Sequence, residues 1–450
     1  MNLIYLHTHD SGRFLPPYFP LPGEGNLLRL AAESAVFGSA FSAAPTCCAS
    51  RSALLTGTWA HQTGMLGLAH RGFSLLYPER HLARVLAGCG YETALAGIQH
   101  EAHGPGAAQQ LGYTTTLEID PELAARIDIG DGRTARDHSE AWDLAVADAA
   151  ARFLMTPRDG PFFLSCGFFN THRDFPPPPD LSESEKAPGI FPDDAGIRND
   201  WSGYLRSAAI VDRAVGRVLA ALRNSGLERN TLVVFTTDHG IAFPRCKATL
   251  YDHGIGVALM IRPPGKVRRS RIDALVSQVD LYPTLCDYLS VPFPKWLEGH
   301  SLRPLIDGKI DEVREDLFAE STYHAAYEPV RCIRTREYKY IRRFDDGSPV
   351  LANVDDGPTK NFYLRERPGE FSSPREMLFE LTSDPGEQRN LADQPEYEAV
   401  KAKLAQRLRH WMKSTKDPLL NGDVPLPAGA VENLRDSLSA TEPVGPAVAV

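Results

Sequence analysis

The sequence contains no long apolar run. No stretch approaches the ~18 uncharged apolar residues that a membrane-spanning helix requires. Residues 1–7 have neither a basic region nor an apolar segment long enough for a secretory signal. These absences lead us to expect a protein with no membrane partner and a cytoplasmic location.

Cysteine is also scarce, and its distribution argues against a disulfide framework. The cysteines are odd in number, and none forms the Cys-x-x-Cys pair that is common in metal sites. They are Cys47, Cys48, Cys89, Cys166, Cys246, Cys286 and Cys332. We therefore expect free thiols in a reducing compartment.

Positive charge is in deficit as well. The 48 lysine and arginine residues are outnumbered by 57 aspartate and glutamate residues, which gives a formal net charge of -9. This balance argues against a nucleic-acid or anionic-membrane partner. An anionic small substrate would need a local basic pocket. With 43% hydrophobic and 23% charged residues, the composition is otherwise that of a globular protein, and the length allows two or three domains.

Short apolar runs that predict buried parallel strands recur along the first 260 or so residues. They are Leu3–Leu6, Thr93–Ala96, Phe162–Phe169, Leu232–Thr236 and Val257–Ile261. Segments with apolar residues at helical spacing accompany them: Glu79–Ala87, Glu140–Leu154, Tyr204–Leu222 and Gln278–Leu289. Strands that alternate with helices predict an α/β fold, with a mostly parallel sheet covered by helices on both faces.

The pattern changes in the last third of the chain. Residues 331–343 alternate like two half-exposed strands around a turn, and residues 397–412 have the pattern of an amphipathic helix. We therefore predict a main domain over residues 1–314 and a smaller α+β subdomain over residues 315–417. Residues 418–450 would form a tail that is either disordered or wraps the surface as an arm.

A separate segment within the main domain has the composition of a loop. The proline-rich stretch from Phe175 to Asp180 and the polar run that continues to Asn199 are typical of an active-site loop or lid.

Polar residues follow four of the predicted strands at the point where each strand ends. The four segments are His7–Arg13, Gly97–His100, Asn170–His172 and Thr237–Gly240. In open α/β sheets, ligands bind outside the carboxyl ends of the strands. Each histidine or aspartate taken alone is more often a cap or a satisfied polar residue. Their convergence on one rim of the sheet predicts a functional site.

A short helix is predicted between Pro45 and Gly57, with Thr46 as its cap and Gly57 as its terminator. A group at the amino end of such a helix lies in a positive field, which suits an oxyanion. Arg51, one turn further on, can reach back to Cys47. The alternative is a pair of small buried cysteines in an alanine-rich helix.

The sequence Cys-x-Ala-x-Arg followed by Leu-Leu-Thr-Gly in this helix resembles the signature of type I sulfatases of the alkaline phosphatase superfamily. Segments along most of the chain are similar to the same family. They include Asn2–Gly12, Pro161–His172, Thr237–Gly240, Val279–Leu285, Gly299–Leu302 and Leu378–Leu391. Residues 243–252 are most similar to the heparan N-sulfatase (sulfamidase) branch. The resemblance implies an alkaline-phosphatase-like sheet with a smaller carboxyl-terminal subdomain.

The resemblance also implies a set of site residues. Cys47 would be oxidised to formylglycine by a formylglycine-generating enzyme and would share one divalent metal ion with Asp10, Asp238 and His239. The other implied catalytic residues are Arg51, His100, His172 and Lys247. Arg51 would hold the nucleophile, which attacks sulfur while Lys247 and His172 neutralise the sulfuryl oxygens. His172 would protonate the leaving oxygen, and His100 would deprotonate the second formylglycine hydroxyl to expel sulfate.

The sequence departs from the family pattern at two positions. His9 stands where the family has an aspartate, and Ile98 stands where it has a sulfate-binding lysine. We expect Ca²⁺, which suits four oxygen ligands, and Mn²⁺ or Zn²⁺ are the alternatives, because imidazole from His9 or His239 would shift the preference towards them. His9 could instead lie behind the ligands or bind substrate. Arg13, close to the first metal loop, is the candidate to replace the missing lysine in substrate binding.

The leading hypothesis is a hydrolase that removes O- or N-linked sulfate from a sulfated carbohydrate or small molecule. A phosphonate monoester or phosphodiester hydrolase of the same superfamily is the first alternative, because those enzymes often have a pair like Asp238-His239. A non-catalytic relative that binds sulfated ligands is the second alternative, suggested by the substitutions at residues 9 and 98.

Overall fold

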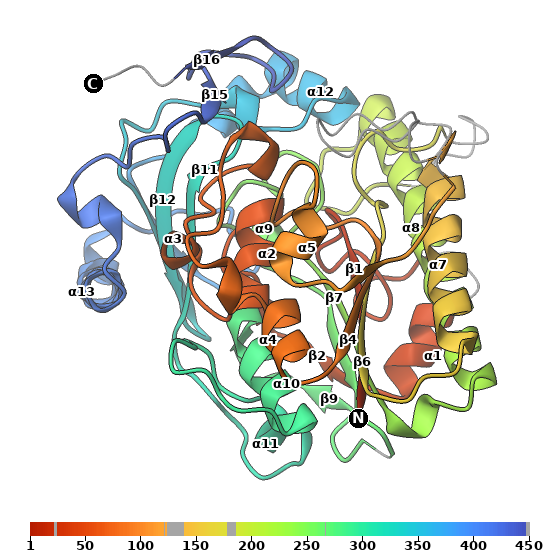
Figure 1. Ribbon diagram of the computed structural model, residues 1–450. Helices are drawn as coiled ribbons and strands as arrows, with labels where there is room; N and C mark the ends of the chain where they lie inside the picture. Colours follow the sequence, from red (N-terminus) through yellow and green to blue (C-terminus); the bar gives the residue numbers. More distant parts are fainter. Residues whose placement is uncertain (22–24, 121, 124–138, 178–185, 266, 447–450) are drawn as a thin grey trace.

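The computed structural model describes residues 1–21, 25–120, 122–123, 139–177, 186–265 and 267–446. Its centre is an eight-stranded sheet with the order β5-β4-β6-β1-β7-β8-β2-β9 (Figure 1). These strands are β1 (Asn2–Thr8), β2 (Ala35–Phe37), β4 (Glu92–Gly97), β5 (Thr115–Thr116), β6 (Phe162–Gly167), β7 (Thr231–Thr237), β8 (Leu259–Arg262) and β9 (Arg271–Ile272). Two further short strands, β3 (Ala40–Phe41) and β10 (Val276–Ser277), pair beside it.

The five strands from β5 to β7 run parallel, as predicted, but β8 is antiparallel to both of its neighbours. The prediction of a parallel strand at Val257–Ile261 was therefore wrong in direction. A fully buried apolar run looks the same in either orientation, because the direction depends on the connection and not on the side chains. The sheet is mixed and mostly parallel.

Helices cover both faces of the sheet, and strand alternation explains why. Ile4 and Leu6 of β1 belong to one apolar core, while Leu3 and Tyr5 belong to the other. The first core is covered by α1 (Asn26–Ala32), α7 (Ser139–Met155) and α8 (Ala195–Asn224) (Figure 1). The second is covered by α2 (Cys47–Thr56), α4 (Leu82–Gly88), α10 (Leu281–Leu289) and α11 (Arg303–Ile306). Short helices α3 (Ala60–Thr63), α5 (Ala107–Leu111) and α9 (Asp252–Ile255) lie in the connections.

Helix α8 begins earlier than predicted. Asp194 caps its first turn by accepting hydrogen bonds from the backbone of Gly196 and Ile197, so residues 195–199 are helical and do not belong to a lid. Residues 178–185 of the predicted lid lie outside the described residues. The predicted helix at 278–289 starts with one 3₁₀ turn over Gln278–Asp280 and continues as α10.

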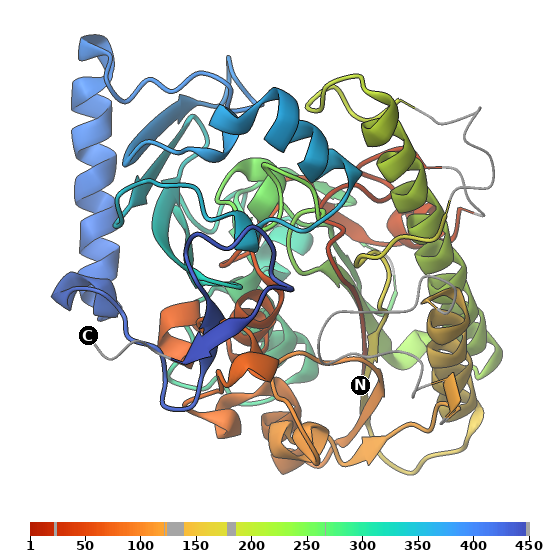
Figure 2. The same cartoon turned by 90° about the horizontal axis from the view of Figure 1, so that it is seen from above.

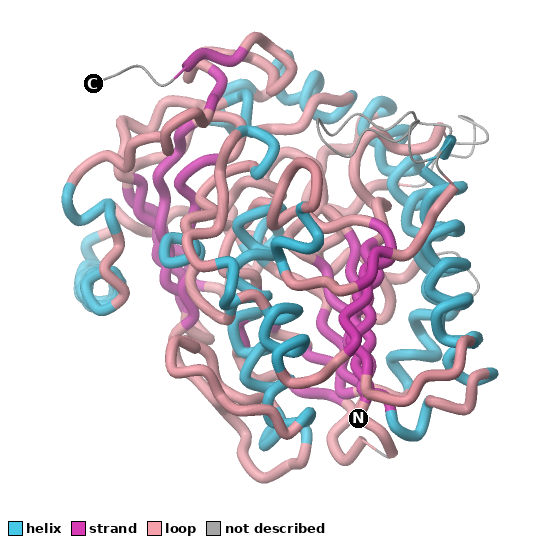
Figure 3. Tube along the Cα trace, viewed as in Figure 1, coloured by secondary structure: helices cyan, strands magenta, loops and turns pink. Residues whose placement is uncertain are grey.

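The last third of the chain forms a four-stranded antiparallel sheet beside the main sheet (Figures 1 and 3). Its strands are β11 (Leu317–Tyr323), β12 (Tyr327–Arg334), β13 (Tyr338–Arg343) and β14 (Glu376–Glu380). Helix α13 (Glu398–Ser414) packs on it, and α12 (Pro358–Glu366) precedes β14. This confirms a carboxyl-terminal α+β subdomain, while its boundaries at residues 315 and 417 stay a prediction.

Strands β12 and β13 are buried more deeply than predicted. Arg331 is fully buried, where it donates to Asp417 through Nε (2.6 Å) and Nη2 (3.0 Å) and pairs with Glu320 at 3.3 Å. Lys339 is also fully buried and pairs with Glu387 at 2.8 Å. Charged residues in an alternating pattern predict an exposed face, but these two side chains find carboxylate partners far away in the sequence.

Residues 418–446 run across the top of the molecule in Figure 1 and carry β15 (Val431–Asn433) and β16 (Val444–Pro446). Arg71 fixes this arm by donating to Asn433 Oδ1 at 2.7 Å and to the Ala440 carbonyl at 2.9 Å. Seen from above, the arm lies over the orange segment that follows α2, which contains Arg71 (Figure 2). Residues 447–450 lie outside the described residues. No helix in the described parts of the chain is long and apolar enough to cross a membrane.

The buried Arg331 predicts a large effect on stability. Replacing it in Arg331→Ala leaves the Asp417 carboxylate buried without its arginine, while Glu320 keeps His61 at 2.9 Å. The unpaired buried charge costs about 3–5 kcal/mol of unfolding free energy. Denaturant titration followed by circular dichroism measures this cost. Arg336→Ala is the control, because Arg336 lies between β12 and β13 with 59% of its side chain exposed. Its effect stays within about 0.5 kcal/mol, and equal effects of both variants would contradict the assigned role of Arg331.

Candidate functional site

The candidate site lies where the loops after β1 and β7 meet the amino end of α2. Four side chains from these segments, His9, Asp10, Cys47 and Asp238, each place one ligand atom within 4.8 Å of the others, and all four residues are buried. The carboxyl ends of β1 and β7 are neighbours in the parallel sheet, so the fold itself brings the two loops together.

Asp238 holds the two loops in register. Its Oδ1 accepts hydrogen bonds from the backbone N–H of Asp10 and of His239, both at 2.9 Å. Its Oδ2 accepts from Arg51 Nη2 at 2.9 Å. Asp10 adopts a left-handed backbone with φ of 46°, a conformation that aspartate tolerates better than most residues. The Asp10 carboxylate thereby points into the cluster.

His239 presents a nitrogen lone pair to the cluster. Its Nδ1 lies 2.9 Å from the Gly240 carbonyl, which can only accept, so Nδ1 carries the proton. In the neutral ring, Nε2 is then free to bind a cation, and it lies 3.2 Å from Cys47 Sγ and 3.3 Å from Asp10 Oδ1. A carbonyl that fixes the ring of a metal-binding histidine in this way is typical of metal sites.

The surroundings of His9 show whether a metal ion fits these residues. Its side chain is fully buried, and neither ring nitrogen has a hydrogen-bond partner among the described residues. Its Nδ1 lies 3.4 Å from Asp238 Oδ2. Burial, and then the charge of Arg51, keep the pKa of His9 well below its ordinary value, so the ring is neutral and can donate a lone pair. Two buried carboxylates beside unpartnered imidazole nitrogen form a donor set that fits a divalent cation.

Cys47 begins helix α2 and is 3% exposed. Its Sγ lies 3.6 Å from Asp10 Oδ1. Burial raises the pKa of the thiol well above its ordinary value, and the Asp10 and Asp238 carboxylates raise it further against the effect of Lys247. An unmodified Cys47 is therefore a neutral thiol and a poor nucleophile.

Arg51 lies beneath the cluster. Its guanidinium donates to the Thr8 carbonyl at 2.6 Å, to His7 Nδ1 and to Asp238. No hydrogen bond from Arg51 to Cys47 is found within the described parts of the chain. In this structure Arg51 ties α2 to the loops after β1 and β7, and its predicted reach back to the nucleophile at residue 47 stays a prediction.

Lys247 lies between two carboxylates. Its Nζ donates to Asp10 Oδ2 at 2.8 Å and to Asp355 Oδ1 at 3.1 Å. Burial alone would lower the pKa of Lys247, but the two carboxylates outweigh burial and raise it well above its ordinary value. Burial alone would raise the pKa of Asp10, but Lys247, His172 and His239 together hold it below its ordinary value. Lysine and carboxylates are thus all charged at neutral pH.

Two further histidines border the cluster on different sides. His172 donates from Nδ1 to the Arg173 carbonyl at 2.6 Å, and its Nε2 lies 3.9 Å from Asp10 Oδ2. The ring of His100 lies 4.3 Å from the ring of His9, and its Nε2 has no hydrogen-bond partner within the part of the chain that the structure describes. Burial, followed by the charge of Arg51, keeps the pKa of His100 well below its ordinary value. A neutral His100 can accept a proton.

A match to a family model decides the identity of the fold and site. A model of the sulfatase family matches residues 19–291, which is more than half of the chain. The chain belongs to the sulfatase family. A second model, described as "N-sulphoglucosamine sulphohydrolase, C-terminal", matches residues 242–363. The protein is thus an enzyme that hydrolyses sulfate esters, as the cysteine motif predicted.

Known sulfatases resemble the chain over most of its length. Human N-sulphoglucosamine sulphohydrolase is 26% identical over 444 residues, which cover 86% of this chain and 85% of the human protein. A solved structure in complex with its substrate D-glucosamine-2-N,6-O-disulfate has a TM-score of 0.70 at 19% identity and covers 92% of this chain and 98% of that one. The phosphonate monoester hydrolase of Agrobacterium radiobacter has a TM-score of 0.69 at 18% identity, with 92% and 96% covered. These two structures support the fold.

Two candidate residues of the sulfatase site were missed from the sequence, and both come from the carboxyl-terminal subdomain. Asp355 follows the Leu351–Asn353 turn and binds Lys247, and His324 directly follows β11. Burial, and then the charge of Lys247, keep the pKa of His324 well below its ordinary value. The only sequence signal was the acidic pair at residues 355–356 before a glycine.

Of the two predicted substrate-binding residues, Arg13 needs correction, whereas the role of His9 in substrate binding stays a prediction. Arg13 lies over the ring of Phe41, 4.3 Å from its centroid, and donates to the Ala40 carbonyl at 2.7 Å. Its guanidinium is thus committed away from the cluster and does not replace the missing lysine. His9, also predicted to bind substrate, is buried among the candidate metal ligands. Ile98 packs into the core of the sheet with 1% exposure.

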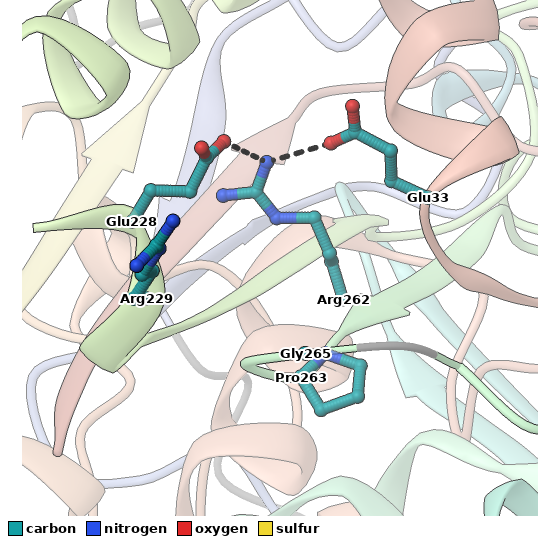
Figure 4. A pocket seen from close by; sticks show the side chains of 6 residues that line it. All are labelled: Glu33, Glu228, Arg229, Arg262, Pro263 and Gly265. Carbon is teal, nitrogen blue, oxygen red and sulfur yellow. Dashed lines mark hydrogen bonds and ion pairs between the residues drawn. The ribbon is translucent and has the colours of Figure 1, made fainter.

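A separate small cavity of about 220 Å³ lies at the amino end of β7, away from the sulfatase site. Arg262 of β8 projects between Glu33 and Glu228 there, with distances of 2.9 Å and 3.0 Å (Figure 4). The arginine links the end of α1 to the turn before β7. Its charge is neutralised by the two carboxylates, so we assign it a structural role.

A loop behind the site depends on one buried carboxylate. Asp143 of α7 accepts hydrogen bonds from the backbone of Phe169 and Asn170, and from the Asn170 side chain. Thr171 then donates through Oγ1 to the backbone carbonyls of His9 and Asp10. Asp143 therefore supports the metal loop and His172 from outside the cluster.

This arrangement predicts the effect of Asp143→Ala. Loss of the acceptor frees the 169–172 loop, so affinity for Mn²⁺ and turnover both fall by about 10–100-fold, as for other residues that support metal ligands. Titration calorimetry with Mn²⁺ measures the affinity. Asp148→Ala, on the same helix but paired with Arg217 at the surface, leaves the affinity unchanged. An unaltered affinity in Asp143→Ala, with a normal melting temperature, would remove Asp143 from the site.

Proposed function

We propose that this sulfatase removes an O- or N-linked sulfate from a sulfated carbohydrate, with formylglycine at residue 47 and a divalent cation beside it. The observation that carries the proposal is the single buried group of His9, Asp10, Cys47 and Asp238 at the amino end of α2. A helix amino end favours developing negative charge. The positively charged side chain of Lys247 adds to this effect, because it is bonded to Asp10 of the same group.

When bound, the cation would supply Lewis-acid stabilisation of negative charge, and formylglycine would supply the nucleophile. The chain's own residues perform the remaining tasks. Asp238 and Arg51 fix the two ligand loops. The His172 side chain is 13% exposed, and its Nε2 lies 3.9 Å from Asp10 Oδ2. Because Nδ1 already donates to the Arg173 carbonyl, a proton taken up on Nε2 makes an imidazolium, which can deliver that proton to the leaving oxygen or nitrogen. His100, neutral and unpartnered at Nε2, can accept a proton from the residue at position 47.

Carbohydrate as the substrate class rests on the relatives. The human relative is named for N-sulphoglucosamine, and one structural neighbour was solved with a disulfated glucosamine as its substrate. We extend this class of substrate to the present chain. A formylglycine-generating enzyme is then a required partner. A cytoplasmic location belongs to the proposal as well, and it is supported by the seven cysteines, because none of them is paired in a disulfide.

The alternative of a phosphonate monoester or phosphodiester hydrolase draws support from the Asp238-His239 pair and from the fold shared with such a hydrolase. Parallel turnover of an aryl sulfate and an aryl phosphodiester separates the two. We expect a higher kcat/KM for the sulfate ester. A large preference for the phosphodiester would establish the alternative.

The formylglycine prediction is tested on the residue itself. After coexpression with a formylglycine-generating enzyme, mass spectrometry of the peptide that contains residue 47 shows an aldehyde in place of the thiol, and Cys47→Ala loses all turnover. Cys89→Ala is the control, because Cys89 is an exposed free thiol outside the metal group. An unmodified thiol in a protein that still binds sulfated ligands would favour the non-catalytic alternative.

The imidazole donors predict the metal preference. Nitrogen from His9 and His239 beside two carboxylates favours Mn²⁺ or Zn²⁺ over Ca²⁺. His9→Asp replaces one nitrogen donor by oxygen, so the ratio of Ca²⁺ to Mn²⁺ affinity rises by about tenfold. This is the lower end of the about 10–100-fold range found when residues around a metal are changed. Competition titration measures the ratio without any turnover. A ratio that does not change would show that His9 is not a ligand.

A further inference from the structure

Two neighbouring cavities lie next to the catalytic group. The first has a volume of about 280 Å³ and the second of about 480 Å³. They share Ala69, His70, Ala102 and His103 in their linings. The rings of His70 and His103 lie 6.4 Å apart in an edge-to-face arrangement. We call the two cavities together the His70 groove, and the size of each is in the range of small-molecule sites.

The inner end of the groove reaches the catalytic group. His100 and Cys48 line the first cavity. His100 also offers a nitrogen within 4.8 Å of ligand atoms of His9 and Cys47. A substrate whose sulfate is held at Cys47 can therefore extend past His100 into the groove.

The outer end of the groove is bounded by the carboxyl-terminal arm. Gly429 and Val431 line the second cavity opposite His70 and Pro78. The arm packs tightly here, since a Cβ added to Gly72 would lie 2.8 Å from Ala430 Cα. Gly72 also has a φ of 95°, a conformation that favours glycine.

The arm is fixed to the same segments that complete the catalytic site. The Asn433 backbone donates to the Ala325 carbonyl at 2.9 Å, next to His324. Lys360 donates to the Leu438 carbonyl at 2.6 Å and pairs with Asp356, next to Asp355. The wall of the groove and the catalytic residues of the subdomain therefore form one connected unit.

We propose that the His70 groove binds the sugar residue next to the sulfated one, so that the arm sets the length of saccharide that the enzyme prefers. The lining suits an oligosaccharide, because imidazole rings and the amide of Gln110 can exchange hydrogen bonds with hydroxyl groups. Histidine rings also provide faces for sugar packing. The saccharide chemistry rests on the proposed function.

Binding measurements on the full chain test the groove without any turnover. The two probes are D-glucosamine-2-N,6-O-disulfate and a heparin-derived tetrasaccharide that ends in the same residue. Calorimetry on the wild type should give at least about tenfold tighter binding of the tetrasaccharide, equivalent to one or two added hydrogen bonds with packing. Equal affinities for the two probes would overturn the proposal.

Variants on α5 and on the carboxyl-terminal arm show whether the added affinity for the tetrasaccharide comes from the His70 groove. Gln110→Ala should weaken tetrasaccharide binding by about two- to tenfold, the loss of one hydrogen bond. Val431→Trp should weaken it by more, because the indole fills the cavity from the arm. Gln109→Ala, one residue away on α5 and outside both linings, and Leu434→Trp, on the arm with Leu434 57% exposed, are the matched controls and should bind as the wild type does.

The outcomes separate this inference from the proposed function. If the groove variants bind the tetrasaccharide as tightly as the controls, the groove is not a saccharide site even if the enzyme removes sulfate. If the tetrasaccharide binds in the groove but neither probe loses sulfate on incubation with the matured enzyme, the proposed function fails and the groove stands.

Discussion

The site depends on the hydrogen bonds that the Asp238 carboxylate accepts. It accepts from the backbone of Asp10, from the backbone of His239 and from Arg51, so three separate segments are fixed by one buried group. A buried carboxylate is costly unless its oxygens are hydrogen-bonded and its charge is balanced. Here the balance comes from Arg51, whose own helix starts with Cys47. The nucleophile, the ligands and their support are therefore positioned together.

The carboxyl-terminal subdomain completes the same network from the opposite side. Asp355 shares Lys247 with Asp10. Lys339 of β13 bonds the Leu250 carbonyl at 2.9 Å and Glu387, so the segment after Lys247 is held by the second sheet. Burial of these charges removes them from water, and each is offset by a partner on another segment. The site is thus built at the contact between two sheets.

The sequence predicted the site residues best where they directly follow a strand of the central sheet. The loops after β1, β4, β6 and β7 were predicted to meet at one rim because parallel strands carry their carboxyl ends to one edge, and the structure places them there. The Cys47 motif predicted the helix and the family. In contrast, β8 was predicted parallel, since buried apolar runs contain no information on strand direction.

Other features could not be read from the sequence, because they depend on contacts between distant segments. Asp355 and His324 become site residues only when the second sheet packs on the first. Arg331 lies in an alternating pattern that predicts a half-exposed strand. Its burial could not be predicted, because its partner Asp417 lies 86 positions away. Arg13, next to the metal loop in sequence, turns to Phe41 instead. The local sequence pattern predicts which helix or strand a residue belongs to. Tertiary packing decides which group becomes the partner of a charged side chain.

The shared ion pair of Lys247 has a consequence for the timing of activity. Asp10 and Lys247 precede the second sheet in the chain, whereas Asp355 follows β13, so translation produces the first carboxylate well before the second. Until Asp355 has been made, the lysine has one of its two counter-charges. A nascent chain that has folded its central sheet but not yet the segment after β13 therefore holds an unfinished centre, and hydrolysis must await that segment.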